Sequence, residues 1–394
     1  MRTLPRKLLL QPSAEYGCKM NTAPASSDRY VQLLPGDPVP WFQQRTTSNP
    51  RFVFDSIAGQ YVVMSFIGDT RDDAARQAIQ AIDAHRKCFD DERASFFGIT
   101  IDPRDEREKR LRESFPGIRV FWDFDRRVSK LYGSAPIDSN PGTAIAYRRF
   151  WLVLDPTLRV LQRFRFDQHA ALFAYLEELP PPDRFTSIEL QAPVLILHSV
   201  FEPELCRDLI RAYEAHGGDE SGFMSEVDGL TVLEHDPGFK IRRDYVITDA
   251  DLIKRIQGRV NRRIVPEIVK VHQFKATRME RYIVACYAAA EGGHFQPHRD
   301  NTTPGTAHRR FAISINLNDD FDGGHLSFPE YGPKGFKVPL GGAVVFSCSL
   351  LHRVSRVTAG RCYAFLPFLY DEEAAKLRER NAAKTQIGSD YKAG

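Results

Sequence analysis

The residues of this sequence best suited to chemistry are His298 and Asp300, two ligand-type side chains separated by one residue. They lie in a short run, 295–300, that has the pattern of a β-strand. Side chains of a strand alternate between its two faces, so both would project from one face while Arg299 points away. An imidazole and a carboxylate held in this way form a preformed two-point chelate for a metal ion.

One more histidine would complete the 2-His-1-carboxylate triad, which leaves coordination positions open on Fe(II). His352 is the strongest candidate, because it opens a predicted strand after the turn at 347–351. His308 lies in a polar loop and His325 follows two glycines at a position that suits the surface equally well, so both fit less well. A histidine taken alone is more often a surface or core residue than a ligand.

The elements that must position these residues lie in the C-terminal half. Three consecutive prolines at 180–182 can continue neither a helix nor a sheet ladder, and we place a domain boundary there. Beyond the boundary, helices are expected at 202–216 and 249–265. Short alternating runs broken by glycine then occupy 281–370, which is typical of a sandwich or jelly-roll barrel.

Before the prolines, strands alternate with helices, which predicts a three-layer α/β fold. We expect strands at 61–67 and 96–101, and helices at 72–89, 104–114 and 169–179. The predicted organisation is a flexible N-terminal tail at 1–32, an α/β domain at 33–180, and a mainly β domain at 186–394 with its core at 281–370.

Length and composition agree with this division. A chain of 394 residues predicts two or three domains. With 42% hydrophobic and 27% charged residues, collagen-like, low-complexity and wholly disordered classes are excluded. No apolar run approaches the ~18 residues of a membrane span, so we expect no membrane partner and a cytoplasmic location. Six cysteines without a CxxC pair argue against a disulfide framework or a zinc knuckle.

Charge does not point to nucleic acid. The net charge of +3 is too balanced, although residues 240–281 contain twelve basic against five acidic side chains. Within that stretch Leu252, Ile256, Val260 and Ile264 recur at helical spacing, as in an amphipathic helix with a solvated basic face. We therefore predict no nucleic-acid partner.

A series of landmarks surrounds the candidate ligands in a specific order: Tyr287, Gly292-Gly293-His294-Phe295, Pro297 to Asp300, Arg310 to Asn318, Phe321 to Gly324, Val338 to Gly341, Phe346, His352 and Val357. In this order the region 192–370 resembles the prolyl 4-hydroxylase-like 2-oxoglutarate and Fe(II)-dependent dioxygenases, whose fold is a double-stranded β-helix, a jelly-roll variant. The resemblance implies that His298, Asp300 and His352 bind iron.

The same resemblance implies Fe(II), 2-oxoglutarate and O2 as cofactors, with ascorbate as an accessory reductant. It assigns the Tyr287 phenol to the far carboxylate of 2-oxoglutarate. Related enzymes that halogenate carry a small residue in place of the aspartate, so Asp300 favours hydroxylation. The substrate could be a free amino acid, a peptidyl residue or a small natural product, because a fold does not determine its substrate.

One landmark departs from the commonest pattern. The family most often places a lysine or arginine ten positions after the distal histidine, where it pairs the far carboxylate of 2-oxoglutarate, and Cys362 stands there. Arg361 lies one position early, and a slip of one residue turns a side chain to the opposite face unless a bulge re-aims it. We expect Arg361 to pair the carboxylate, with Arg310 as its substitute.

The first domain resembles the peroxiredoxin branch of the thioredoxin-like fold, through the turn at 34–40 and the strand at 61–67. Peroxiredoxins place a reactive cysteine just after that strand, but residues 68–75 contain none. Cys88 lies several helical turns further on. We therefore predict a redox-inactive domain that serves as a scaffold, as a substrate-recruiting module or as the surface of a homodimer.

Two rival hypotheses remain. The chain could be a thiol-dependent peroxidase whose C-terminal half is a binding domain, against which the missing nucleophile argues. It could also be a catalytically silent binding protein, which only the departure at Cys362 supports.

Overall fold

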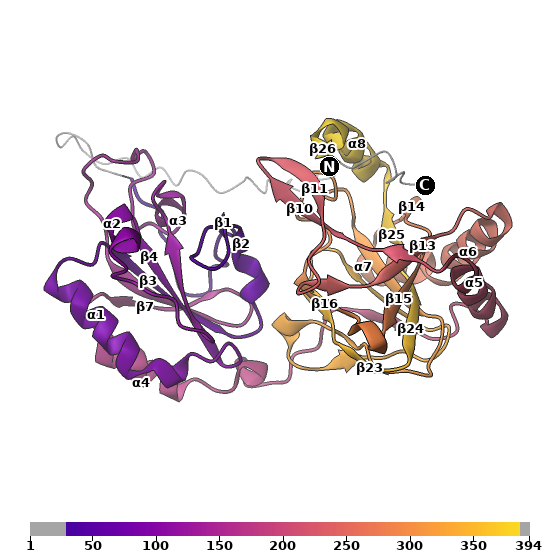
Figure 1. Cartoon of the computed structure of the whole chain (residues 1–394), viewed down its shortest axis with the longest axis horizontal. Helices are drawn as coiled ribbons and strands as arrows, with labels where there is room; N and C mark the ends of the chain where they lie inside the picture. The colour runs from indigo at the N-terminus through magenta and orange to yellow at the C-terminus, as the bar shows by residue number, and fades with distance from the viewer. Residues whose placement is uncertain (1–28, 387–394) are drawn as a thin grey trace, which may run out of the picture.

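All eight residues of β3 (Tyr61–Gly68) are buried, and nearly all are apolar or small. A strand buried on both faces needs cover on both sides of its sheet, which explains this continuous apolar run. The computed structural model describes residues 29–386 and places β3 at the centre of a five-stranded sheet (Figure 1). The sheet order is β5-β4-β3-β6-β7, with β4 (Ala94–Thr100), β5 (Ile118–Trp122), β6 (Phe150–Leu154) and β7 (Val160–Arg165).

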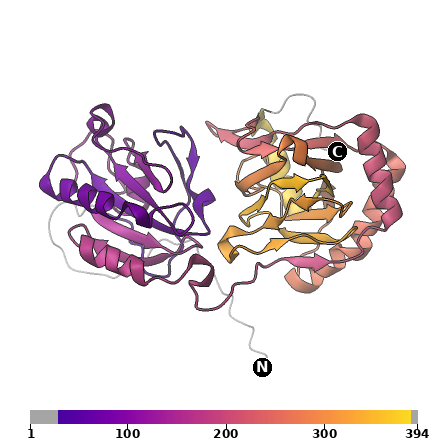
Figure 2. The same ribbon diagram turned by 60° about the horizontal axis from the view of Figure 1, so that its bottom comes forward.

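Helices α1 (Asp73–Ala84) and α4 (His169–Glu178) cover one face of this sheet (Figure 2). The Asp72 side chain caps α1 by accepting a hydrogen bond from the backbone N–H of Ala75. The other face carries an aromatic cluster beside α3 (Arg127–Leu131) and the hairpin of β1 (Gln43–Gln44) and β2 (Phe52–Val53). The sheet is therefore covered on both sides, as the sequence predicts for this half.

Two predicted helices are shorter than expected. Helix α1 ends at Ala84, although the sequence predicts a helix over 72–89, and a short 3-10 helix follows at Arg86–Cys88. Helix α2 spans only Pro103–Arg107, although the sequence predicts a helix over 104–114. Asp102 caps its first turn, and Lys109 adopts a left-handed backbone with φ +52° soon after its end. Leu111 is the only apolar residue of the predicted range, so no apolar stripe holds further turns against the sheet.

The second half of the chain contains two main sheets. The larger one runs β14-β25-β17-β24-β15-β13-β9, with β21 beside β17 and β8 beside β21. Its strands are β8 (Leu195–Leu197), β9 (Asp219–Glu220), β13 (Arg243–Val246), β14 (Arg278–Glu280), β15 (Ile283–Ala288), β17 (Phe311–Asn316), β21 (Ala343–Ser347), β24 (Arg361–Phe365) and β25 (Phe368–Tyr370). The smaller one consists of β12 (Lys240–Ile241), β16 (His294–His298), β22 (His352–Val354), β19 (Leu326–Ser327) and β20 (Gly335–Phe336).

Helices cover the outer face of the larger sheet, and the first two of them lie at the far right of Figure 1. They are α5 (Pro203–His216), α6 (Ala250–Arg263) and α7 (Val265–His272), while α8 (Glu372–Asn381) follows the last sheet strand. The minor strands are the hairpin β10 (Phe223–Val227) and β11 (Leu230–Glu234), joined by β26 (Thr385–Gln386), and the pair β18 (Asp322–Gly323) and β23 (Val357–Ala359). The predicted mixture of an α/β half and a strand-rich half is confirmed.

The predicted amphipathic helix of the basic stretch is α6. Its buried positions include Ile256 and Val260, as the spacing predicts. Two of its cations bind carboxylates of the neighbouring segment: Arg255 pairs with Asp208, and Arg259 pairs with Glu202. These contacts bind α6 to α5 and neutralise part of its charge within the protein.

Within residues 29–386, none of the helices has both the length and the apolar character that a bilayer crossing requires. All five cysteines of this range are free thiols. Cys18 and most of the predicted flexible tail, residues 1–28, lie outside the described residues.

The two halves pack against each other. Leu351, which precedes β22 of the second half, is completely buried in the aromatic cluster of the first half. Close approach also occurs at Gly59, whose φ is +104° and where a Cβ atom would lie 2.7 Å from Cβ of Pro329. Only glycine suits this position, since it combines a left-handed backbone with the absence of a side chain.

We expect Leu351→Ala to lower the free energy of unfolding by about 2 to 5 kcal/mol, because it removes a fully buried leucine from the joint between the halves. Chemical denaturation of both proteins measures the difference. Leu34→Ala is the matched control, since Leu34 is half exposed and should cost much less. Equal losses in the two variants would contradict the packing described for Leu351.

Candidate active site

Two neighbouring strands bring the candidate ligands together. Strands β16 and β22 pair antiparallel, and His298 and His352 are direct partners in their register. Asp300 follows the end of β16, two residues beyond His298, so it returns to the same face. The strand alternation that the sequence predicts brings His298 and Asp300 to one face, and the register of β22 against β16 adds His352.

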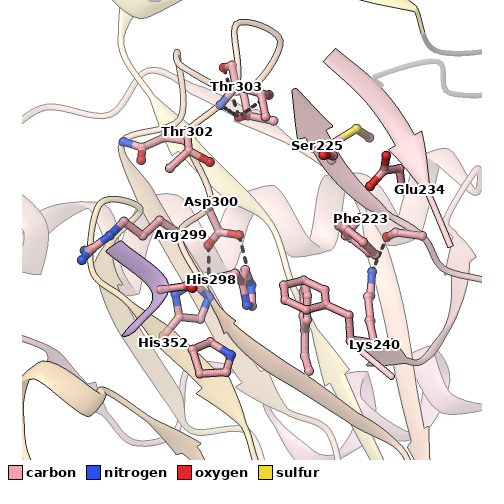
Figure 3. A pocket seen from close by; sticks show the side chains of 18 of the residues that line it. Phe223, Ser225, Glu234, Lys240, His298, Arg299, Asp300, Thr302, Thr303 and His352 are labelled. Carbon is pink, nitrogen blue, oxygen red and sulfur yellow. Dashed lines mark hydrogen bonds and ion pairs between the residues drawn. The ribbon is translucent and has the colours of Figure 1, made fainter. Parts of the chain in front are cut away.

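Their ligand atoms converge. One atom from each of His298, Asp300 and His352 lies within 4.8 Å of the other two (Figure 3). Nε2 of His298 is 3.7 Å from Oδ1 of Asp300, and Nε2 of His352 is 3.4 Å from Oδ2 of the same carboxylate. Both imidazoles thus direct the same nitrogen toward one point beside the carboxylate.

Backbone carbonyls orient the two imidazoles. Nδ1 of His298 lies 2.7 Å from the carbonyl oxygen of Gln296, and Nδ1 of His352 lies 3.0 Å from that of Leu350. A neutral imidazole that donates Nδ1–H in this way leaves the lone pair of Nε2 available for a metal. Burial holds the pKa of His298 well below its ordinary value, and the adjacent His352 lowers it further. The donor set of two neutral imidazoles and one carboxylate fits Fe(II).

Aromatic rings hold the imidazoles from behind. The ring of Phe295 stacks on that of His298 with centroids 3.5 Å apart, and the ring of Phe346 meets that of His352 edge-on at 4.7 Å. These contacts restrict ring rotation, so the ligand geometry is set by packing as well as by hydrogen bonds.

Arg299, between the two ligands, points away from them, as the sequence predicts (Figure 3). Its side chain is only 2% exposed and pairs with two carboxylates, Asp55 of the first half at 2.9 Å and Glu330 of the second half at 2.8 Å. It also donates to the carbonyl oxygen of Ser349, and the indole of Trp41 lies 4.2 Å from its guanidinium carbon. The ligand-bearing strand is therefore attached to the first half of the chain.

The ligands line a large cavity of about 1090 Å³. One wall comes from the first half, through a segment from Trp41 to Ser56, and another from the hairpin β10–β11. An ion pair between Arg51 and Glu234 connects these two walls. Residues from both halves thus surround the space in front of the candidate metal ligands.

The two residues predicted to bind the far carboxylate of 2-oxoglutarate, Tyr287 and Arg361, do not lie together in the structure. Tyr287 is buried and lines the cavity, and burial raises the pKa of its phenol. Arg361 does not line the cavity: its side chain is largely exposed on the opposite face of β24 and pairs with Glu214 at 3.2 Å. The expectation for Arg361 is therefore corrected, because no bulge re-aims it and Cys362 is the residue that pairs with Tyr287 and faces inward.

The substitute that the sequence predicts also lies elsewhere. Arg310 donates to the carbonyl oxygen of Ala307 and is not among the residues that line the cavity. The weaker histidine candidates have other surroundings too. His308 is buried, 2.9 Å from the carboxylate of Glu280, and His325 is exposed.

Sequence reasoning missed a basic cluster on the cavity wall, formed by Lys240, Arg242 and Arg281 around Asp244. The sequence contains these cations within the basic stretch 240–281, which we interpreted as a solvated helix face. Only α6 fits that interpretation. The apolar and turn residues on either side of Lys240 and Arg242 were the available signal for a strand.

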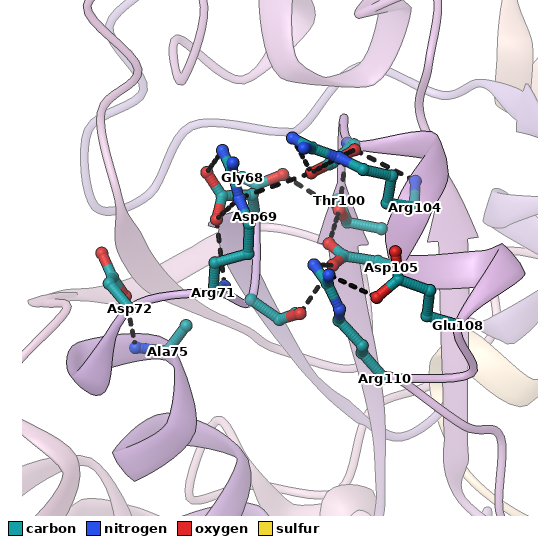
Figure 4. Close-up of polar contacts among 12 residues, drawn as sticks. Gly68, Asp69, Arg71, Asp72, Ala75, Thr100, Arg104, Asp105, Glu108 and Arg110 are labelled. Atoms are coloured by element: carbon teal, nitrogen blue, oxygen red, sulfur yellow. Dashed lines mark hydrogen bonds and ion pairs between the residues drawn. The ribbon is translucent and has the colours of Figure 1, made fainter.

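The first half has no comparable reactive site where a peroxiredoxin carries its cysteine. In this segment Asp69 forms an ion pair with Arg71, and the Asp72 side chain caps α1 (Figure 4). Nearby, the carboxylate of Asp105 binds Thr100 and Arg110. Cys88 lies beyond α1, where burial raises the pKa of its thiol and the carboxylate of Glu177 adds to that effect. The thiol is therefore held in its less nucleophilic protonated form.

Comparison with known proteins supports the resemblance of the second half to 2-oxoglutarate and Fe(II)-dependent oxygenases. Residues 254–369 match the model of the 2OG-Fe(II) oxygenase superfamily. A PKHD-type hydroxylase of Bordetella pertussis is 37% identical over 115 residues, which cover 25% of this chain and 51% of that protein. One from Hyphomonas neptunium is 26% identical over 132 residues, which cover 30% and 58%. The C-terminal region thus resembles these oxygenases, as predicted, and the alignments span about half the length of the curated relatives.

Two solved structures are similar to different parts of the chain. A prolyl hydroxylase from Trichoplax adhaerens, in complex with a peptide fragment of hypoxia inducible factor, covers 50% of this chain and 89% of its own at 15% identity and a TM-score of 0.39. Peroxidoxin BcpB from Mycobacterium tuberculosis covers 38% of this chain and 99% of its own at 20% identity and a TM-score of 0.32.

We expect Asp55→Ala to lower the free energy of unfolding by about 3 to 5 kcal/mol, because it removes a partner from a buried ion pair and leaves Arg299 partly uncompensated. Thermal and chemical unfolding measure the change. The matched control is Asp138→Ala, which breaks an exposed pair with Arg29 and should cost less than about 1 kcal/mol. A small loss for Asp55→Ala would show that this joint contributes little.

Proposed function

We propose that this chain is a non-haem iron dioxygenase that couples oxidative decarboxylation of 2-oxoglutarate to hydroxylation of a substrate C–H bond. The observation that carries the proposal is the convergence of His298, Asp300 and His352 on one point at the wall of a large cavity. The superfamily match over residues 254–369 supports it independently.

In this proposal the three side chains hold Fe(II) through two Nε2 atoms and one carboxylate oxygen. The iron, with 2-oxoglutarate and O2, supplies the oxidising chemistry, and ascorbate can serve as a reductant. The backbone carbonyls of Gln296 and Leu350 orient the two imidazoles so that each Nε2 faces the metal position, and burial favours the neutral form of His298. Asp300 supplies the carboxylate ligand, which favours hydroxylation over halogenation.

We further propose that the substrate lies in the cavity between the two halves. A volume of about 1090 Å³ is at the upper end of what small-molecule pockets offer, and favours a peptidyl residue or a natural product over a free amino acid. Trp41 and Phe52 of the first half line this cavity and would contact such a substrate.

We assign the two halves to a thioredoxin-like domain at 33–180 and a double-stranded β-helix domain at 186–394. The first domain would act as a structural and substrate-binding element without redox chemistry. The aspartates around β3 and the protonated state of Cys88 support this role. The alternative, a thiol-dependent peroxidase, has no nucleophile at the corresponding position.

We expect His352→Ala to weaken Fe(II) binding by at least about tenfold and to abolish succinate formation from 2-oxoglutarate, because a three-ligand open site loses one of its ligands. Anaerobic iron titration and a succinate assay measure the two effects. His325→Ala is the matched control: this histidine is exposed and outside the cavity, so both readouts should be unchanged. Unaltered iron affinity in His352→Ala would refute the ligand assignment.

We expect Cys88→Ser to leave 2-oxoglutarate turnover intact and the native protein to consume no peroxide with a thiol reductant, because the Cys88 thiol is held protonated. Peroxide consumption and succinate formation are measured on the same preparations. Peroxidase turnover that disappears in Cys88→Ser would make the first domain an enzyme and favour the alternative function.

A further inference from the structure

A second polar cluster lines the cavity on β12, on β13 and at the residues beside them. Its cations are Lys240, Arg242 and Arg281, and its carboxylate is Asp244. In Figure 3, Lys240 lies on the other side of the view from His298 and His352. The ring of Phe295 connects the two groups, since it lies 4.9 Å from the Lys240 ammonium and stacks on His298.

Lys240 is only 6% exposed, although it carries an ammonium group. The ammonium donates to the hydroxyl of Ser221 at 2.6 Å and to the carbonyl oxygen of Gly222 at 2.5 Å. No carboxylate of residues 29–386 lies within ion-pair distance of it. Burial therefore lowers its pKa well below the ordinary value, and the positive charge of Arg242 lowers it further. A buried ammonium in these surroundings is stabilised by an anion that enters the cavity.

Among residues 29–386, Arg242 forms an ion pair with Asp244 alone, and Arg281 shares this carboxylate. Its guanidinium donates to both oxygens of Asp244 at 2.7 Å, and Arg281 donates to the same carboxylate at 3.3 Å. Burial alone would raise the pKa of Asp244, but Arg242, Lys240 and Arg281 together hold it well below the ordinary value. Nη1 of Arg242 extends to the phenol of Tyr287 at 3.3 Å, on the cavity side of the cluster.

The position where this kind of oxygenase usually pairs the far carboxylate of 2-oxoglutarate has no cation here. Cys362 faces a small pocket together with Tyr287, Ser314 and mainly apolar side chains, and no lysine or arginine lines that pocket. Arg361, the nearest arginine in sequence, is bound to Glu214 on the opposite face of the strand. Tyr287 lines both the small pocket and the large cavity, and its phenol contacts Arg242.

We propose that Lys240 and Arg242 form a carboxylate-binding subsite, and that it holds the far carboxylate of 2-oxoglutarate in place of the missing cation at position 362. The inference rests on the proposed function. The ammonium supplies a charge without an anionic partner, and the guanidinium supplies a donor beside the Tyr287 phenol. A charged hydrogen bond to the bound carboxylate would give the Lys240 ammonium an anionic partner in addition to its two neutral ones.

The test compares two 2-oxo acids on the protein loaded with Mn(II) under anaerobic conditions, by calorimetric titration. 2-Oxoglutarate and 2-oxopentanoate have the same metal-binding end and chain length, but only the first has a second carboxylate. We expect Lys240→Met to weaken 2-oxoglutarate binding at least tenfold and to leave 2-oxopentanoate binding unchanged. Arg242→Lys keeps a positive charge beside Asp244 and should weaken the binding of 2-oxoglutarate but not that of 2-oxopentanoate. This variant replaces Lys240→Met in the test if Lys240→Met does not fold.

Arg361→Met is the matched control and should bind both acids like the native protein, because Arg361 faces away from the cavity. Equal 2-oxoglutarate affinity in Lys240→Met and Arg361→Met would overturn the subsite. Equal weakening of both acids in Lys240→Met would also overturn it, because a merely structural role predicts that result. If native Mn(II)-loaded protein fails to bind 2-oxoglutarate, the proposed function itself is wrong.

A last titration distinguishes the carboxylate of 2-oxoglutarate from a carboxylate of the second substrate. Propionate is titrated into protein already saturated with Mn(II) and 2-oxoglutarate. If Lys240→Met loses propionate binding but keeps native 2-oxoglutarate affinity, the subsite takes a carboxylate of the second substrate, which overturns the assignment to 2-oxoglutarate. If the subsite holds 2-oxoglutarate, propionate should not bind to the saturated native protein.

Discussion

The buried guanidinium of Arg299 is the interaction on which the arrangement of this molecule depends. Strand alternation requires the residue between His298 and Asp300 to point away from the metal ligands, into the protein. Here that residue meets a carboxylate from each half of the chain, Asp55 and Glu330. Because it is costly to bury a charge without partners of opposite charge, the position of the ligand-bearing strand and the contact between the two halves depend on each other.

Buried charges elsewhere around the cavity are balanced in the same way. Burial alone would raise the pKa of Glu280, but Arg309 and His308 hold it below the ordinary value. Asp244 is held low by its own group of cations. The cavity therefore has walls of fixed charge, with compensation that is local to each cluster. Lys240 differs from the other cations because its direct hydrogen-bond partners, Ser221 and Gly222, are both neutral, and Asp244 acts on it only from a longer distance.

How far the sequence predicts this site depends on whether the relevant contacts are local. Period-two alternation sufficed to place His298 and Asp300 on one face, and the start of a strand sufficed for His352. The orientation of Arg361 depends on the register of β24 against β15, which no local pattern determines. The burial of Lys240 could not be predicted either, because a basic residue within a basic stretch is expected to be exposed, and only the tertiary structure buries it. Helix α2 ended early because Leu111 is the only apolar residue of 104–114, and a single apolar side chain gives no stripe that would pack further helical turns against the sheet.

The pairing of Arg299 with a carboxylate from each half also restricts how this chain can change in evolution. Asp55 and Glu330 lie in different halves, yet both neutralise one side chain that sits between two metal ligands. Loss of the first half would leave Glu330 as the single anionic partner of Arg299 and would expose Leu351 to water. A chain that lost or exchanged its first half would need a compensating change at position 299 as well. The two halves are therefore expected to evolve together. Positions 55, 299 and 330 should covary in related proteins that keep this contact between the halves.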